Sequence, residues 1–329
     1  MWIVESLRRL DLIGANDLPA ATPLSGGVSS DIWRVDVGGE RLCVKRALSR
    51  LKVAADWRVP VERNHYEAEW IRVAADRLPG CVPVLLGEDC SAGLFVMEYL
   101  DPSRNPGWKS VLRGGKADST FAAHVGRAIA AIHGATAGDG EVERRFNTDR
   151  MFHDLRIDPY LLASARRRPD LAGPLTELAD RTAATRKALV HGDVSPKNIL
   201  VGEHGPIFID AECAWYGDPA FDLAFCLNHL LLKCLWVPPH SDAYLQCFRA
   251  LANAYLECVD WEPVEEMEPR TATLLPGLLL ARVDGKSPAE YLTTDEQKDR
   301  VRRAARALLL EPPDSLDAVL RRWREESQQ

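Results

Sequence analysis

Residues 189–212 read LVHGDVSPKNILVGEHGPIFIDAE and hold the densest group of chemically competent side chains in the sequence. Asp193 and Asn198 stand five residues apart, ahead of one short apolar run, and Asp210 follows the next run. We expect the two runs to form a hairpin, which would return Asp210 to the loop that carries Asp193. Turns favour Asp and Asn in general, but a turn does not require this ordered set.

Phosphoryl transfer requires side chains of these kinds. One carboxylate orients an attacking hydroxyl and accepts its proton, while an amide oxygen and a second carboxylate serve as hard ligands for Mg²⁺. The pattern therefore predicts Asp193 as the catalytic base and Asn198 and Asp210 as metal ligands. Glu212, two residues further on, could reach a second metal ion or a water molecule on it.

The upstream sequence offers the parts that would hold ATP. Residues 22–46 predict three strands of an antiparallel sheet, with Lys45 at the end of the third strand. The helix predicted over residues 61–77 offers Glu67 and Glu69 as partners for Lys45. The loop between the first two strands carries small residues that could approach phosphate oxygens, namely Ser25, Gly26, Gly27, Ser29 and Ser30.

The motif HGDVSPKNIL followed by FIDAE resembles the catalytic loop and metal-binding segment of the aminoglycoside phosphotransferase and choline kinase-like family. These small-molecule kinases share the protein-kinase fold, and Gly192, where protein kinases usually have arginine, favours their branch. The resemblance implies the roles given above, places Lys45 on the α- and β-phosphates, and selects Glu67 as its partner. FVMEYLDP resembles the hinge, where backbone groups of Glu98 and Leu100 would bind adenine.

Three further stretches are similar to the methylthioribose kinase branch of that family: VKRALSRLKVAADWRVPVER, FHDLRIDPYLLASARRRPDL and IDAECAWYGDPAFDLAF. The expected acceptor is a sugar-like or other small polyol hydroxyl, although Ser195, Pro196 and Lys197 depart from the usual loop of that branch. The alternative acceptors are aminoglycoside antibiotics, choline and homoserine. A protein kinase and a non-catalytic nucleotide-binding module are the alternatives of other classes.

Four further residues have both a functional and a structural interpretation. Lys197 could stabilise charge on the transferring phosphoryl group as a second catalytic residue, or be an exposed lysine in a turn. Trp215 and Tyr216 could line the acceptor site or pack between lobes. Arg282 could contact the acceptor, because the methylthioribose kinase-like branch uses an arginine in its late helices, or could end a helix. Structural roles are expected for His191, Asp218 and Asp222.

Length and composition agree with a two-lobed globular protein. The chain has 329 residues, more than twice the roughly 150 expected of one domain. Its 46% hydrophobic and 27% charged residues are ordinary for a globular protein. We predict an α+β, bilobal, protein-kinase-like fold. Residues 1–100 would form a nucleotide-binding lobe with an antiparallel sheet and one main helix, and residues 101–329 a mainly helical lobe with the catalytic loop and acceptor site.

Charge and hydropathy limit the partners. The 48 acidic and 41 basic residues give a formal charge of −7, which argues against nucleic-acid and anionic-membrane binding. No apolar run approaches the roughly 20 residues that span a bilayer, and the start of the sequence resembles neither a secretory signal nor a transit peptide. We therefore expect a cytoplasmic enzyme, monomer or homodimer, that uses ATP and Mg²⁺ on a small-molecule hydroxyl acceptor.

Overall fold

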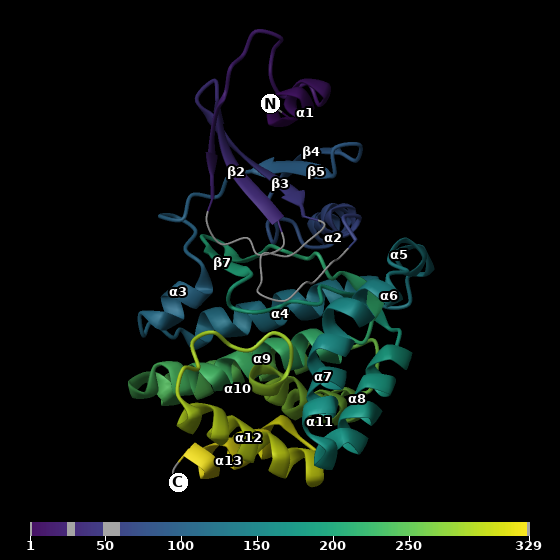
Figure 1. The fold of residues 1–329 in the computed structure, drawn as a ribbon, viewed down its shortest axis with the longest axis vertical. Coiled ribbons are helices and arrows are strands. Elements are labelled where there is room, and N and C mark those ends of the chain that lie inside the picture. Colours follow the sequence, from purple (N-terminus) through teal and green to yellow (C-terminus); the bar gives the residue numbers. More distant parts are fainter. Residues whose placement is uncertain (1, 25–29, 49–59, 328–329) are drawn as a thin grey trace.

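The computed structural model of the chain describes residues 2–24, 30–48 and 60–327, and it places a sheet at one end and a larger helical part at the other (Figure 1). The five-stranded sheet is antiparallel in all its pairings, with the order β1-β2-β3-β5-β4. Its strands are β1 (Ala20–Pro23), β2 (Ser30–Val37), β3 (Glu40–Ala47), β4 (Leu85–Asp89) and β5 (Leu94–Glu98).

The hairpin between β2 and β3 turns at Gly38 and Gly39, which both have positive φ, at 57° and 89°. A two-residue turn of this kind matches the right-handed twist of its strands and needs residues that tolerate positive φ. The sequence also predicts a strand at residues 82–86, but the corresponding strand β4 begins three residues later, at Leu85. Pro83 cannot donate to a ladder, and the Val84 N–H is bonded to the Glu98 side chain at 2.8 Å instead.

Helices cover both faces of the sheet. Helix α1 (Trp2–Arg9), which the sequence analysis did not predict, packs Ile3 and Leu7 against an apolar group that includes Val44 and Val96. Helix α2 (Arg63–Arg77) lies on the opposite face, where Trp70 and Phe95 belong to the main core. Because neighbouring residues of a strand point to opposite faces, Val44 points toward α1 and its neighbour Lys45 is directed toward α2.

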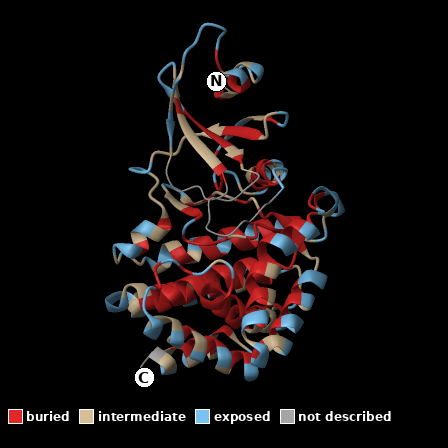
Figure 2. Ribbon diagram, in the orientation of Figure 1, coloured by how far each residue is buried: buried red, intermediate tan, exposed pale blue. Residues whose placement is uncertain are grey.

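The remaining residues are mainly helical, and their buried side chains fill the centre of this part (Figure 2). Helix α9 (Ala220–Trp236) is buried along its whole length except at Trp236, as expected of a helix surrounded by others. The sequence predicts helical patterns at residues 121–133 and 221–236, and the structure has a helix at each of these places. The other long helices are α4 (Ser119–Thr136), α8 (Ala172–Ala184), α10 (Ser241–Leu256), α11 (Val264–Asp284), α12 (Asp295–Leu310) and α13 (Leu316–Ser327).

Short elements complete this part of the chain. Two small antiparallel ladders pair β6 (Ala188–Val190) with β9 (Trp215–Gly217) and β7 (Ile199–Gly202) with β8 (Gly205–Phe208). The short helices are α3 (Trp108–Arg113), α5 (Gly140–Arg145), α6 (Asp149–Phe152) and α7 (Ala163–Arg167), with a π-helix at His153–Leu162 and 3₁₀ turns at Pro169–Leu171 and Pro238–His240. The predicted α+β fold class is confirmed, while the division into lobes at residue 100 stays a prediction. Among the described residues, no helix combines the length and apolar composition that a bilayer crossing requires.

Candidate functional site

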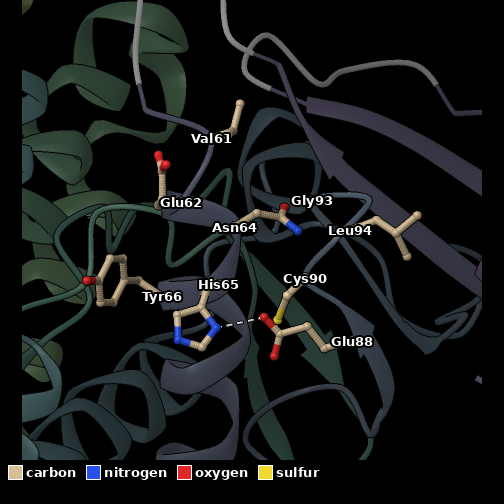
Figure 3. Close-up of a pocket in the computed structure, with 9 residues that line it drawn as sticks. All are labelled: Val61, Glu62, Asn64, His65, Tyr66, Glu88, Cys90, Gly93 and Leu94. Atoms are coloured by element: carbon tan, nitrogen blue, oxygen red, sulfur yellow. Dashed lines mark hydrogen bonds and ion pairs between the residues drawn. The ribbon is translucent and has the colours of Figure 1, made fainter.

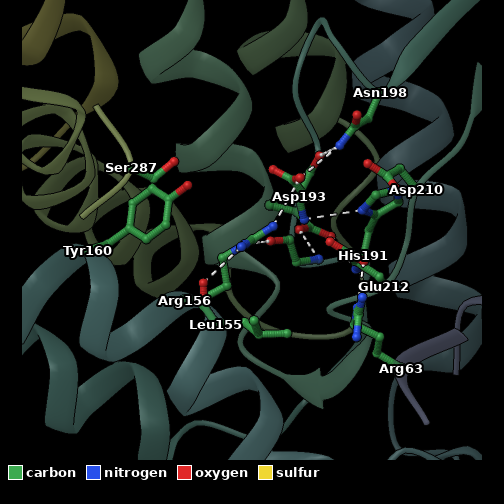
Figure 4. Close-up of polar contacts among 12 residues, drawn as sticks. Arg63, Leu155, Arg156, Tyr160, His191, Asp193, Asn198, Asp210, Glu212 and Ser287 are labelled. Carbon is green, nitrogen blue, oxygen red and sulfur yellow. Dashed lines mark hydrogen bonds and ion pairs between the residues drawn. The ribbon is translucent and has the colours of Figure 1, made fainter. Parts of the chain in front are cut away.

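The catalytic loop predicted from the sequence lies between β6 and β7, and the β7–β8 hairpin brings the chain back to it. The Ile209 N–H donates to the Asn198 carbonyl at 3.0 Å, directly before Asp210. The expected juxtaposition of Asp193, Asn198 and Asp210 is therefore present (Figure 4). Asp210 itself has a φ of 70°, a conformation that a non-glycine residue seldom adopts. Such backbone geometry is concentrated at functional sites.

The loop backbone is fixed from beneath by helix α9. The two oxygens of Asp222 accept hydrogen bonds from the N–H groups of His191, at 2.7 Å, and Gly192, at 2.9 Å. The His191 Nδ1 accepts from the Asp193 N–H at 3.2 Å, and its Nε2 lies 3.2 Å from the Ile209 carbonyl. Burial lowers the pKa of His191, so the ring is neutral. The structural roles expected of His191 and Asp222 are thus what the contacts show.

The carboxylate of Asp193 is oriented by two donors on the same oxygen. The Asn198 amide donates to Oδ2 at 2.8 Å, and Arg156 forms an ion pair with Oδ2 at 3.0 Å. The same guanidinium donates to the carbonyls of Gly192 and Leu155 (Figure 4). These contacts leave the other oxygen of Asp193, Oδ1, available to another partner.

Arg156 is the residue that the sequence analysis missed. It is buried within the π-helix, an element frequently found at functional sites. Its only signal in the sequence is that it stands in one of the stretches similar to the methylthioribose kinase branch, between two apolar residues. A cation on a buried face was the feature that could have identified it.

A second charged group joins the sheet to the catalytic loop. The ammonium of Lys45 lies 2.7 and 2.6 Å from the two oxygens of Glu67, and also contacts Asp210 Oδ1. Burial alone would lower the pKa of Lys45, but the negative charges of Asp210 and Glu67 raise it instead. Burial also raises the pKa of Glu67. The two short contacts with Lys45 favour the ionised carboxylate, so we treat both groups as charged.

The choice between the two glutamates of α2 is resolved by the geometry. Glu67 is buried and faces Lys45, whereas Glu69 pairs with Arg72 and Arg145. The carboxyl of Asp210 is largely buried, which opposes ionisation, but Lys45 holds its pKa below the ordinary value. Asp210 is therefore an ionised carboxylate, and the roles of Asp210 and Asn198 as metal ligands stay predictions.

Glu212 also reaches this region, but a cation already holds it. Its Oε2 lies 3.0 Å from Nε of Arg63 at the start of α2 (Figure 4). Arg63 donates as well to the carbonyls of Leu48 and Pro60, both at 2.7 Å. The role of Glu212 on a second metal ion stays a prediction.

The predicted nucleotide-binding residues fall in two regions. Ser25, Gly26, Gly27 and Ser29 lie outside the described residues, so only Ser30 of that loop is seen. Its hydroxyl is buried in β2 and has no hydrogen-bond partner in the part of the chain that the structure describes. At the hinge, the Glu98 N–H is bonded to Val84 O at 2.9 Å. Leu100, which follows β5, is half-buried.

Trp215 and Tyr216 pack in the protein core, which is the structural interpretation given for them from the sequence. The Trp215 ring stacks on Phe152 with centroids 4.2 Å apart, and its indole N–H donates to Asp149 at 2.8 Å. The Tyr216 hydroxyl donates to the Lys187 carbonyl at 2.9 Å. Both aromatic residues are buried in the main core, so their expected place in the acceptor site is not supported. Lys197 is exposed on the loop.

A separate pocket lies between α2 and the β4–β5 hairpin (Figure 3). His65 Nδ1 lies 2.8 Å from Glu88 there, close to Cys90, and Arg72 forms a second ion pair with Glu88. None of the nine residues drawn in Figure 3 belongs to the catalytic loop.

Comparison with known proteins agrees with this geometry. The model of the phosphotransferase enzyme family matches residues 20–252, which include Lys45 and the whole catalytic loop. The chain belongs to this family. The family resemblance read from the HGDVSPKNIL and FIDAE motifs is thereby confirmed.

Family members of similar sequence and structure agree with that assignment. A methylthioribose kinase of Bacillus cereus is 28% identical over 230 residues, which cover 62% of this chain and 58% of that protein. A choline/ethanolamine kinase family protein from Mesorhizobium loti has a TM-score of 0.51 at 19% identity, covering 99% of this chain and 100% of that one. A spectinomycin phosphotransferase in complex with ADP and spectinomycin has a TM-score of 0.51 at 12% identity, covering 99% and 98%. These structures confirm the expected protein-kinase-like fold.

Gly192 provides a test of how closely the loop fits its surroundings. Its φ is +77°, and a Cβ there would lie 2.5 Å from the Cys213 carbonyl oxygen. Gly80 has a similar φ of +84° but open space around it. We expect Gly80→Ala to lower the free energy of unfolding by about 1–2 kcal/mol through backbone strain alone, and Gly192→Ala to lower it further. Urea denaturation measures both, and equal losses would contradict the close contact with Cys213.

Proposed function

We propose that this protein transfers the γ-phosphoryl group of ATP to a hydroxyl group of a small sugar-like metabolite, using Mg²⁺. The observation that carries this proposal is the meeting of the Lys45–Glu67 pair with Asp210, Asn198 and Asp193 in one site. A turn-forming or packing role would not require a buried lysine to contact two carboxylates. The similarity to methylthioribose kinases supports the sugar-like acceptor, over 58% of the length of the matched relative.

The residues present fit a magnesium nucleotide. Asp210 is an ionised carboxylate, and Asn198 contributes an amide oxygen that its bonds to Asp193 leave free; both are hard oxygen ligands of the kind Mg²⁺ prefers. Lys45, held in place by Glu67, would bind the α- and β-phosphates. When bound, Mg²⁺ would neutralise charge on the phosphate oxygens.

Asp193 acts on the acceptor. Arg156 and Asn198 both occupy Oδ2, so Oδ1 is the oxygen that would accept the proton of the acceptor hydroxyl. As that proton moves to Asp193, the hydroxyl oxygen forms a bond to the γ-phosphorus and the bond to the β–γ bridging oxygen breaks, which releases ADP. Most of the rate acceleration would come from positioning and charge stabilisation.

The first prediction concerns the base. Asp193→Asn keeps the shape of the side chain but removes the proton acceptor, so turnover should fall by about 10²–10⁴ while ATP affinity changes little. A coupled assay of ADP release and a fluorescence titration with ATP measure the two quantities. The control is Asp180→Asn, which alters an exposed carboxylate on α8. Near-normal turnover of Asp193→Asn would remove the residue from this role.

The second prediction concerns the metal ligand. Asp210→Asn should weaken Mg·ATP binding by about tenfold or more, since a charged partner of both Lys45 and the metal is lost. It should also raise the Mg²⁺ concentration that half-saturates turnover. An unchanged metal dependence, measured by titrating Mg²⁺ at fixed ATP, would contradict the assignment of Asp210.

The third prediction concerns Arg156, which acts through Asp193 and is a positioning residue. Arg156→Lys keeps the charge but cannot contact Asp193 and the Gly192 carbonyl with one planar group. We expect kcat to fall about tenfold or more while KM for ATP stays close to normal. A rise in KM for ATP as large as the fall in kcat, or a large fall in melting temperature, would indicate a general structural defect.

The acceptor is identified by a screen of ADP release. The compounds are methylthioribose, related deoxypentoses, choline, homoserine and aminoglycosides, with Asp193→Asn as the negative control. ATP binding without turnover on any hydroxyl compound would favour a non-catalytic nucleotide-binding module.

A further inference from the structure

Three basic residues from three helices form a group beside the catalytic loop. Lys109 belongs to α3, Lys233 to α9 and Arg282 to α11, and we call these three residues the cationic cluster. The Lys109 N–H donates to the carbonyl of Pro196 at 2.7 Å, so α3 contacts the loop directly.

Lys233 is the most unusual member. The residue is 1% exposed, yet within residues 2–24, 30–48 and 60–327 its ammonium group forms no hydrogen bond or ion pair. Its ammonium lies 3.9 Å from the ring centroid of Tyr291 and 4.6 Å from that of Trp236. Cation–π contacts offset only part of the cost of removing an ammonium group from water. Burial, together with the charge of Lys109, lowers the pKa of Lys233 to about 7.

Arg282 is also buried without an acidic partner among the described residues. Its NH1 group donates to the Tyr160 hydroxyl at 3.2 Å and to the carbonyl of Ser287 at 2.6 Å, and both acceptors are neutral. Its Nε is buried and has no hydrogen-bond partner in that part of the chain. A guanidinium normally meets carboxylate or phosphate with several of its donors, so Arg282 has unused capacity.

The acidic residues nearby do not balance this charge. Glu290 forms an ion pair with Lys109, and Asp284 pairs with Arg168 and Arg302. When Lys233 is protonated, the cationic cluster carries three positive charges, and the carboxylate of Glu290 balances one of them. Two positive charges therefore remain. Buried charges are costly unless a partner compensates them, and the described residues 2–24, 30–48 and 60–327 supply no further negative partner.

The cluster is connected to Asp193 through two side chains. Arg156 pairs with Asp193 and lies over the Tyr160 ring, 5.7 Å from its centroid. The Tyr160 hydroxyl in turn accepts the hydrogen bond from Arg282. Figure 4 shows Tyr160 and Ser287 together on the far side of Arg156 from Asn198. A small molecule is therefore the class of ligand that could contact both Asp193 and the cluster.

We propose that the phosphoryl acceptor carries an anionic group, a carboxylate or a phosphate, that binds Lys233 and Arg282 while its hydroxyl lies at Asp193. The placement of the hydroxyl rests on the proposed function, whereas the anion site stands on the cluster alone. An acceptor of this chemistry is a hydroxy acid or a sugar phosphate. Cationic aminoglycosides and choline would be repelled, and methylthioribose, which is neutral, would leave the two charges unpaired.

The test uses three probes with one carbon skeleton. Glycerate, glycerol 3-phosphate and glycerol differ only in carrying a carboxylate, a phosphate or no charge, and choline serves as a cationic probe. Calorimetric titrations with Mg·ADP present compare the wild type with Lys233→Met and with Lys116→Met, a matched change at an exposed lysine. At least one anion should bind tenfold or more tightly than glycerol. Lys233→Met should weaken that binding by about 10- to 100-fold, and Lys116→Met should not.

The outcomes separate this inference from the proposed function. Anion binding that is no tighter than glycerol binding, or that is unaffected by Lys233→Met, overturns the anion site. ADP release from neutral acceptors with kcat/KM unaffected by Lys233→Met overturns it as well, while leaving the kinase intact. Failure of the wild type to release ADP with any compound, together with Lys233-dependent anion binding, would instead contradict the kinase. Whether glycerate or glycerol 3-phosphate binds more tightly distinguishes carboxylate from phosphate.

The melting temperature provides an independent measurement, and it also shows whether the Lys233→Met variant folds. Lys233 has an ordinary pKa of 10.5 when unfolded and about 7 in the folded protein, so the folded state binds fewer protons between these values. The lysine therefore destabilises the fold most at and below pH 7, and the penalty disappears as pH rises toward 10.5. Lys233→Met should raise the melting temperature at pH 7, by a margin that shrinks with rising pH. A lower melting temperature at pH 7 would contradict the unpaired ammonium. The titratable and charged groups around Lys233 are Lys109, His229, Arg282, Glu290 and Tyr291.

Discussion

The contact of Lys45 with Asp210 joins the sheet to the catalytic loop, and the candidate site depends on it. Together with Glu67, these residues place one positive and two negative charges in a largely buried position. Buried ion pairs seldom add stability, because the desolvation of both partners offsets their attraction. The arrangement is better explained by its net negative charge, which lies in the loop region that also holds Asn198. A divalent cation is the partner that this charge suits, and it would bring the nucleotide phosphates to Lys45.

The catalytic loop is held in place by a separate set of contacts. Asp222 binds the N–H groups of His191 and Gly192, and the neutral His191 ring binds the chain on both sides of Asp193. Arg156 in addition holds the carboxylate of Asp193 through an ion pair. These contacts come from α9 and the π-helix, both of which are anchored in the main core. Preorganisation of this kind lets a weak base contribute through orientation.

The sequence predicted the parts of the site that are local in the chain. Asp193, Asn198 and Asp210 belong to one loop and one hairpin, so their spacing alone determines that they meet. Lys45 was identified by its place at the end of the predicted third strand, but its partner Glu67 was selected by the family resemblance. Arg156 and helix α1 were not predicted, because their contacts join segments far apart in the sequence. Lys233 gave no signal either, since it stands in an apolar helix where a lysine near the C-terminal end is unremarkable.

The two charged groups of the site have opposite signs, and this difference indicates which ligand binds at each group. The group at Lys45 is negative overall and the cationic cluster is positive overall, with Arg156 and Asp193 between them. A magnesium nucleotide on the first and an anionic acceptor on the second would each neutralise its own group. The acceptor hydroxyl would then approach the γ-phosphoryl group without the repulsion that two uncompensated anions experience in a medium of low dielectric constant. No contact within the described chain compensates for the cost of burying Lys233. A negative charge on the acceptor would compensate for it.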